Sequence, residues 1–540
     1  MNRSPLLLIL LLAGCPEPSD APDAGHDAGV TDAGSVDAGP AVDAGPAPTG
    51  CHLFSADAGA GAMGDAGALP GPGDFPPPVG PGAPSTPFES GDIGRSCAFL
   101  PMGDTDEDHH NSGFFLDGYF VRPWAHERGR GGVAVWDFDD PCDPALVANV
   151  LDDQIRETHA TGLSNIGGRW VVVASLTGIQ FWDMSDITNP SLVNDFTLPM
   201  VRYPDSYMRV VMSTFWQAPF VYVGASDNGI YVVDATDPRA PEIVGQYQPE
   251  PLFRVGQVMA VGNFLYVFSS EGSVASILDI RDPRQPRPIP GGTYAITNGS
   301  LDRLDRPVPL PAYFGMVNGG YMYHPRIGFS GGLAIFDVSD PTSPSFIGDW
   351  EAPGGDGGYV YIKEGVAFVG FSDYGSTLDI SDPSAPFEIH RFEHEGDVDT
   401  LTPLGNVVVV SADDDAAPGE ASAVVPFSEA VDRVAPAVNM VVPVADASDQ
   451  PLTTRVGLTF TEFVSMNSVF EGSVILRDPS GAPVPGHLSG QEGVVSFWPV
   501  EPLAPETRYT IEVPAGGVTD LNGNPVATGF SSTFTTVSCE

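Results

Sequence analysis

A short repeated unit in the middle of the chain constrains its fold more than any other feature. The clearest copy, residues 229–241, is a run of Ile, Tyr and Val that ends at Asp234 and continues into Asp237-Pro238. β-Branched and aromatic residues in such a run favour a buried strand. The Asp accepts hydrogen bonds from backbone amides two residues on, and the proline then stops the strand. The unit therefore predicts a strand followed by a fixed turn.

The unit recurs at a nearly constant spacing. Further copies lie at residues 132–144, 178–190, 274–286, 332–344 and 375–386. Its first Asp stands at positions 137, 183, 234, 279, 337 and 379, so successive copies are 42–58 residues apart. That period is typical of a four-stranded β-propeller blade. A second kind of strand-like run precedes the unit and occurs seven times, the last time before a degenerate unit at 423–427. We therefore predict an all-β protein with a seven-bladed β-propeller, six of whose repeats are clear.

The ends of the propeller are predicted to meet in one blade. Residues 98–100, Ala-Phe-Leu, are similar to the outer strands that follow each turn, such as residues 242–244. An outer strand that stands before the first inner strand can complete the last blade. Such a closure hides sheet edges that would otherwise be unpaired.

The consensus of the unit is Gly-x-x-(apolar)-(apolar)-Asp-x-x-Asp-Pro-x-x-Pro. It resembles the LVIVD repeat of bacterial and archaeal surface β-propellers, and the resemblance covers residues 97–430. The second copy departs from it, with Ile187 in place of the first proline. The resemblance implies a propeller and an extracytoplasmic location, and no particular biochemical activity.

Composition agrees with a turn-rich β protein and limits its partners. The 540 residues include 63 glycines and 54 prolines, and no long stretch has the period of a helix. The length indicates more than one domain. The formal net charge of −47 argues against nucleic acid and anionic lipid surfaces as general partners.

The amino-terminal region has the pattern of an exported and anchored protein. Residues 1–15 contain a short positive region and an apolar run too short to span a bilayer. Leu12-Ala13-Gly14-Cys15 resembles the lipobox of bacterial lipoproteins, which implies that Cys15 is acylated. Residue 16 is Pro rather than the Asp that retains enterobacterial lipoproteins in the inner membrane, so the resemblance favours a location at the outer membrane. Residues 16–95 repeat Asp-Ala-Gly and are rich in proline, so we expect a disordered tether before a propeller at 96–432.

Residues 435–540 are expected to form an Ig-like β-sandwich. Strand candidates lie at 455–460, 473–477, 493–497, 509–513 and 530–536, separated by Pro, Gly and Asn. The pair Phe460 and Phe463, the stretch 503–509, and the Asp-Leu-Asn-Gly-Asn-Pro stretch at 520–525 resemble the bacterial Ig-like domain of surface-layer proteins. That resemblance implies a spacer or adhesive module.

Five cysteines occur in the sequence. With Cys15 assigned to lipid, Cys51, Cys97, Cys142 and Cys539 remain for two disulfides in an oxidising compartment, with three pairings open. Their spacing does not match a zinc or redox motif.

The best candidate site is one mouth of the propeller channel. The positions just before the inner strands are polar or charged in five blades: His110, His159, Arg209, Arg254 and Asp397. Glu157 and His394 lie near them. Imidazole with carboxylate is suited to a divalent metal, and a pair of arginines to an anion. A wet, polar mouth without a ligand is the alternative interpretation.

Two functions therefore stay open, because no catalytic motif is present. The first is a lipid-anchored protein of the bacterial cell envelope, expected to be monomeric, which presents its propeller and Ig-like module for binding or adhesion to an envelope or extracellular protein or polysaccharide. The second is a metal-assisted extracytoplasmic hydrolase that acts at the channel mouth, with a divalent ion as its cofactor.

Overall fold

The computed structural model describes residues 86–101, 108–109, 112–116, 118–126, 131–156, 162–164, 169–202, 209–328, 331–352, 354–413 and 415–538. Their regular structure is β apart from one 3₁₀ turn, η2 (Met466–Ser468), which confirms the all-β prediction. No helix in these residues is long and apolar enough to cross a membrane.

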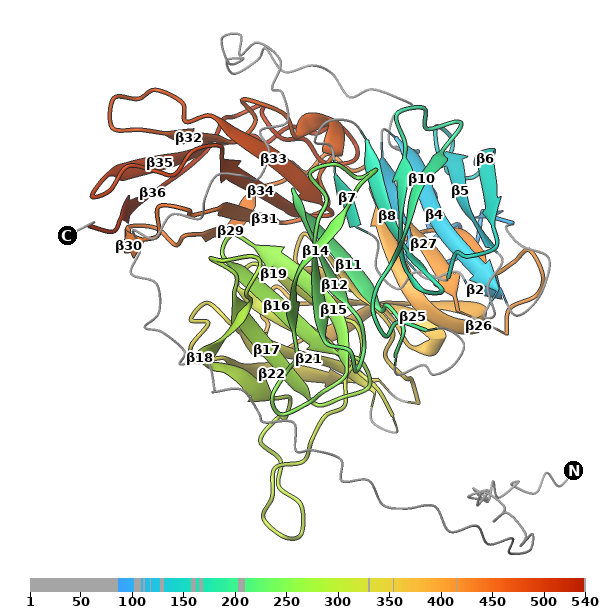
Figure 1. Ribbon diagram of the computed structural model, residues 1–540. Helices are drawn as coiled ribbons and strands as arrows, with labels where there is room; N and C mark the ends of the chain where they lie inside the picture. Colours follow the sequence, from blue (N-terminus) through green and yellow to red (C-terminus); the bar gives the residue numbers. More distant parts are fainter. Residues whose placement is uncertain are drawn as a thin grey trace, which may run out of the picture. The chain divides into compact units, whose positions relative to one another are not determined.

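Seven antiparallel blades form a β-propeller in the described part of the chain (Figure 1), as predicted. The strands of blade 1 are β2 (Asp108–His109), β3 (Phe114–Leu116), β4 (Tyr119–His126), β5 (Gly131–Asp137) and β6 (Ala145–Asp152). Those of blade 2 are β7 (Gly162–Ser164), β8 (Trp170–Ser175), β9 (Gly178–Asp183) and β10 (Ser191–Thr197). Those of blade 3 are β11 (Ser213–Gln217), β12 (Phe220–Gly224), β13 (Ile230–Asp234) and β14 (Glu242–Tyr247).

The next two blades follow the same order, from the inner strand outward. The strands of blade 4 are β15 (Val255–Val261), β16 (Phe264–Ser269), β17 (Val274–Asp279) and β18 (Arg287–Ala295). Those of blade 5 are β19 (Met316–Asn318), β20 (Tyr321–Arg326), β21 (Gly332–Asp337) and β22 (Ser345–Glu351).

The predicted Asp turns form as their chemistry requires. In blade 3, Asp234 Oδ1 accepts a hydrogen bond from the amide of Thr236 at 3.0 Å, and Asp237 Oδ1 accepts one from the amide of Arg239 at 3.0 Å. The strand before this turn, β13, is buried up to Asp234. Local sequence therefore determines both the strand and its end.

Blades 6 and 7 share one long strand. Blade 6 contains β23 (Val360–Lys363), β24 (Val366–Gly370), β25 (Ser372–Asp379) and the first part of β26 (Phe387–Leu404). Residues 387–393 of β26 pair with β25, and residues 398–404 pair with β27 (Val407–Ala412), which is followed by β28 (Ser422–Pro426). The strand therefore leaves blade 6 as its outer strand and enters blade 7 as its inner strand.

The chain closes the ring from its amino-terminal side, as the sequence predicted. The outer strand of blade 7 is β1 (Ala98–Phe99), whose Ala98 pairs with Val424 and whose Phe99 pairs with Ala423. Leu100, the next residue, is fully buried. β1 therefore covers the edge of β28 and is itself the short outer edge of blade 7.

The segment just before β1 is packed on blade 7, although the sequence assigned it to the tether. The amide of Phe88 donates to the carbonyl of Glu429 at 3.1 Å, and that of Gly94 to the carbonyl of Pro426 at 2.9 Å. The composition of this segment, rich in proline and polar residues, did not predict the packing, because the hydrogen bonds come from the backbone.

One disulfide joins the start of β1 to the turn of blade 1. Cys97 is bonded to Cys142, and their Cα atoms lie 5.1 Å apart. Cys15, Cys51 and Cys539 lie outside the described residues.

The carboxy-terminal strands form a two-sheet sandwich, as predicted. One sheet contains β29 (Val438–Val442), β31 (Val456–Phe460), β34 (Val494–Pro499) and β33 (Gly486–Gln491). The other contains β30 (Ala447–Gln450), β36 (Phe530–Thr536), β35 (Arg508–Val513) and β32 (Ile475–Arg477). The sequence did not predict β29, β30 and β33; β29 and β30 are exposed or half-buried along most of their length, and the first half of β33 is half-buried.

Candidate functional site

We name the two faces of the propeller by the connections that they carry. The loop face holds the connections between successive blades, and the turn face holds the turns between each inner strand and its second strand. Of the predicted site residues, Arg209, Arg254 and Asp397 lie just before inner strands and belong to the loop face. His110, His159 and Glu157 lie outside the described residues, so their part in a metal site stays a prediction.

The described members of the predicted site are separated on the loop face. Arg209 is exposed, whereas Arg254 forms ion pairs with Glu271 and with Asp227, the latter at 3.6 Å between Nε and Oδ1. His394 is half-buried, and burial lowers its pKa. Within the described residues, no hydrogen bond or ion pair joins Arg209, Arg254, His394 and Asp397 to one another.

Asp397 belongs to a group of acidic residues. Burial raises its pKa against a hydrogen bond from Ser372, and the neighbouring carboxylates of Asp413, Asp356 and Asp415 raise it further. One carboxylate oxygen of Asp397 is buried without a hydrogen-bond partner. The surroundings of Asp397 are therefore more acidic than the sequence indicated, with no described histidine bonded to it.

Apolar side chains meet at the centre of the loop face. Val210 and Met212 precede the inner strand of blade 3, Phe314 precedes that of blade 5, and Tyr359 precedes that of blade 6. All four side chains belong to one buried cluster. The rings of Phe314 and Tyr359 are stacked with centroids 4.7 Å apart. Because blades 3 and 6 are not neighbours in a ring of seven, these side chains meet across the channel. Apolar side chains therefore occupy the part of the channel where these four residues meet, beside the predicted polar positions.

The Ig-like sandwich covers the turn face. Asn318, the last residue of β19, donates from Nδ2 to the carbonyl of Phe460 at 2.8 Å. The amide of Trp216, in β11, donates to Oε1 of Gln491 at 3.1 Å. The ring of Tyr361 contacts that of Phe463 with centroids 5.2 Å apart. Backbone, amide and aromatic groups from blades 3, 5 and 6 therefore all engage the sandwich.

Close backbone approach makes this contact tight. A Cβ at Gly457, in β31, would lie 2.0 Å from the amide nitrogen of Gly262 in the turn after β15. A Cβ at Gly262 would lie 2.6 Å from a side-chain carbon of Val442. Glycine at these positions allows sandwich and propeller to touch through their backbones.

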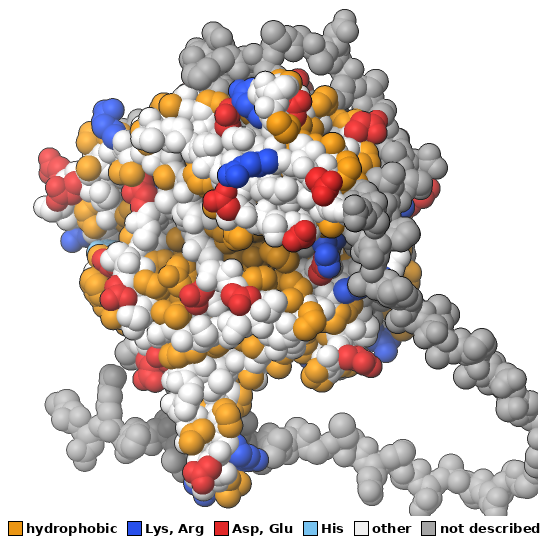
Figure 2. Space-filling model, turned by 90° about the vertical axis from the view of Figure 1, so that its left-hand side faces the viewer, with side chains coloured by type: hydrophobic (Ala, Val, Ile, Leu, Met, Phe, Trp, Pro, Cys, Tyr) orange, Lys and Arg blue, Asp and Glu red, His pale blue; other side chains and the backbone are white. Residues whose placement is uncertain are grey.

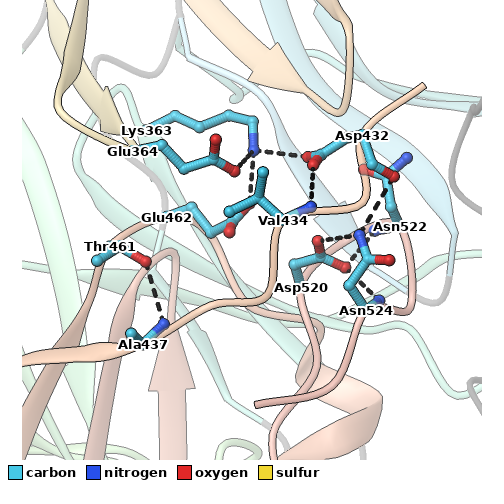
Figure 3. A network of polar contacts seen from close by, with 10 residues as sticks. All are labelled: Lys363, Glu364, Asp432, Val434, Ala437, Thr461, Glu462, Asp520, Asn522 and Asn524. Atoms are coloured by element: carbon cyan, nitrogen blue, oxygen red, sulfur yellow. Dashed lines mark hydrogen bonds and ion pairs between the residues drawn. The ribbon is translucent and has the colours of Figure 1, made fainter. Parts of the chain in front are cut away.

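The most polar part of the junction is built around Lys363, at the end of β23 (Figure 3). Its ammonium lies 2.6 Å from Oδ2 of Asp432, 2.6 Å from Oε2 of Glu462 and 2.8 Å from Oε1 of Glu364. The Lys363, Asp432 and Glu462 side chains are only 9%, 6% and 4% exposed. The ligand oxygens of the three carboxylates lie within 4.8 Å of one another, and the cation that they share is the ammonium.

The charges of this junction alter its protonation. Burial lowers the pKa of Lys363, but the carboxylates of Glu462, Asp432 and Glu364 outweigh that and raise it overall. Burial raises the pKa of Glu462 to about 8, against the pull of Lys363. Burial also raises the pKa of Asp520 to about 6, although Asn524 hydrogen-bonds its carboxylate. The lysine is therefore held in its charged form, while Glu462 takes up a proton more readily than an exposed glutamate.

Sequence reasoning missed this junction, although one signal pointed to it. The chain has 23 basic residues of the Lys and Arg types, and Lys363 is the only lysine among them. Its partners stand 69 and 99 positions further along the chain. No local spacing brings them together.

Comparisons with known families agree with the observed strands. A profile of the LVIVD repeat matches residues 219–248, 316–351 and 354–393, which lie in blades 3, 5 and 6. A profile of the bacterial Ig-like domain matches residues 432–536. The chain is an LVIVD-repeat β-propeller followed by a bacterial Ig-like domain. A search of curated proteins finds no match.

Solved propeller structures are similar to this LVIVD-repeat protein at low identity. The β-propeller domain of Myceliophteria thermophila Cps50 (Swd1) is 11% identical, with a TM-score of 0.41, over 56% of this chain and 94% of that one. The WD40 repeats of RRP9 are 9% identical, with a TM-score of 0.43, over 60% of this chain and 98% of that one.

Proposed function

We propose that this protein is a lipoprotein of the bacterial outer membrane that binds an envelope or extracellular partner through the loop face of its propeller. The lipobox-like Leu12-Ala13-Gly14-Cys15, followed by Pro16, supports this location. The observation that carries the proposal is the difference between the two faces. The sandwich covers the turn face, whereas the loop face is free of it and presents large apolar side chains to solvent.

An arm on the loop face is the most prominent of these features. The connection between β18 and β19, residues 296–315, is longer than the other described connections between blades and extends as a narrow loop in Figure 1. Leu301 and Leu304 in the arm are 59% and 65% exposed. Figure 2 shows the arm as a projection at the bottom of the molecule.

The arm is held in shape by its own contacts. Arg306 binds the carboxylate of Asp302 through Nε at 2.9 Å and Nη2 at 2.8 Å, and the amide of Leu304 donates to Oδ1 of Asp302 at 2.8 Å. An exposed apolar tip on an ordered loop is suited to partner recognition, because little ordering entropy is lost on binding.

Two experiments test the proposal. The change Cys15→Ser should release the protein from the membrane fraction, because acyl chains supply the anchoring free energy. Leu301→Ser with Leu304→Ser should weaken adsorption of the purified protein to whole cells or isolated envelopes. The control is Leu151→Ser, which alters an equally exposed leucine (59%) on the outer strand of blade 1. Equal adsorption of the arm variant and the control would refute the role of the arm.

A further inference from the structure

The only lysine of the chain, Lys363, lies at the junction between propeller and sandwich. In a buried ion pair, arginine would bind a carboxylate more strongly than lysine does. A guanidinium keeps its charge when buried and binds a carboxylate through two parallel hydrogen bonds. What lysine has and arginine lacks is an amine that can lose its proton and act as a nucleophile. All other basic positions of the Lys and Arg types are arginine. The choice at residue 363 therefore points to the reactivity of the amine.

The geometry around Lys363 places this amine against a carboxyl group. Its Nζ lies 2.6 Å from Oδ2 of Asp432, and both side chains are buried. The other oxygen of that carboxylate, Oδ1, accepts a hydrogen bond from the amide of Val434 at 2.9 Å (Figure 3). The two oxygens of Asp432 therefore have different partners: one faces the amine and the other faces a fixed backbone donor.

We propose that Lys363 and Asp432 become joined by an intramolecular isopeptide bond, which fastens the start of the Ig-like domain to blade 6 of the propeller. The bond forms between Nζ of Lys363 and Cγ of Asp432, and the bond from Cγ to Oδ2 breaks. An ammonium and a carboxylate become one amide and one water, so charge and atoms balance without an oxidant or an activated co-reactant.

For each step of amide formation, a side chain or backbone amide lies where the step needs it. Proton transfer from the ammonium to Oδ2 gives a neutral amine beside a neutral carboxyl group. When Nζ attacks Cγ, negative charge develops on Oδ1, where the Val434 amide stabilises it as an oxyanion-hole donor does. Oδ2 then leaves as water after it receives a second proton.

Glu462 is the catalytic residue for the second proton transfer. Its Oε2 lies 2.6 Å from Nζ, so it touches the reacting nitrogen, and its Oε1 is buried with no hydrogen-bond partner among the described residues. Since its oxygen touches the reacting nitrogen, lies within 4.8 Å of an oxygen of Asp432, and burial raises its pKa, Glu462 can give a proton to Oδ2 and take one from the nitrogen.

The ion-paired form is the resting state before reaction, because the carboxylates favour the charged lysine. Amide formation therefore passes through a minor neutral pair and is slow. The reaction takes place once per chain, so a slow rate is sufficient. Its product removes two charges from a site where they would otherwise stay buried.

A lysine-specific endoprotease tests the proposal on the wild-type chain alone. Since residue 363 is the only lysine, the reduced and denatured chain has one cleavage site. An amide on Nζ blocks that site, so we expect the chain to remain whole and its intact mass to be lower by one water. Cleavage into two fragments with the full sequence mass would overturn the proposal, and this readout needs no folded variant.

Matched variants assign the roles. Lys363→Arg keeps the positive charge and should have the full sequence mass. Glu462→Gln retains the Lys363–Asp432 contact and should leave Lys363 open to cleavage. Persistence of the bond in that variant would refute the role of Glu462. Tandem mass spectrometry of the linked peptides should place the bond at Asp432, and a bond to Glu462 would contradict the assignment.

Discussion

Closure of the propeller by β1 can be tested by two truncations, one that keeps residues 86–101 and one that removes them. Removing residues 16–85 leaves every described contact of the propeller in place. Removing residues 16–101 deletes β1, Leu100 and Cys97. The first variant should be as stable as the full chain, whereas in the second blade 7 should open.

The structure gives the expected magnitude. Leu100 is fully buried among apolar side chains of blades 1 and 7, and loss of such a side chain costs about 2–5 kcal/mol. The amides of Cys97 and Leu100 donate to the carbonyls of Val424 and Ser422, both at 2.9 Å. Together with hydrogen bonds of about 0.5–1.5 kcal/mol each, the local opening free energy of blade 7 should fall by about 3–8 kcal/mol.

Hydrogen exchange measures this opening directly. Amides of β27 and β28 should exchange at least about a hundredfold faster in the shorter variant, because each 1.4 kcal/mol is a factor of ten. The control keeps β1 and carries Cys97→Ser and Cys142→Ser, which separates the strand from the disulfide. Unchanged exchange in β27 relative to that control would show that β1 does not hold the blade closed.

Three further predictions follow from buried or close-packed groups. Whether the junction is ion-paired or linked, Lys363→Met should lower the free energy of unfolding by about 3–5 kcal/mol, because it leaves the buried Asp432 as a carboxylate without a cation. The half-exposed pair of Arg477 with Glu512 is its control, since Arg477→Met should cost less than about 1 kcal/mol; equal losses would contradict the reasoning. Burial lowers the pKa of His324 to about 3, so the folded state needs a neutral ring. Stability should therefore fall as pH drops from about 6.5 toward 3, by about 4 kcal/mol at the low end, and His324→Gln should remove that slope in acid titrations. Gly457→Val should separate sandwich from propeller in small-angle scattering, whereas Gly91→Val, with no atom near the new Cβ, should not.

The sequence by itself determined the blades, because their signals are local. A buried run, an Asp that accepts bonds from the next amides and a proline lie within one short segment, as in residues 229–241. The number of repeats predicted seven blades, and the strand-like residues 98–100 predicted that the amino-terminal segment closes the ring. These features involve contacts that every blade makes with itself or its neighbour.

The metal ligands of the candidate site stay a prediction. Arg209, Arg254 and Asp397 lie on the loop face, but the alignment of the repeats did not show which apolar side chains meet in the channel. Val210, Phe314 and Tyr359 lie in different blades and meet only after the ring has closed. Sequence spacing within one repeat contains no information on such a meeting.

Only the tertiary structure decided how the sandwich covers one face of the propeller. The contact of Gly457 with Gly262 and the enclosure of Lys363 by Asp432 and Glu462 join segments that are 69 to 195 positions apart in sequence. Burial at that junction, rather than residue type, raises the pKa of Glu462 and places an amine against a carboxyl group. The physical reason is that desolvation and contact depend on which surfaces meet, and a single sequence shows each surface separately.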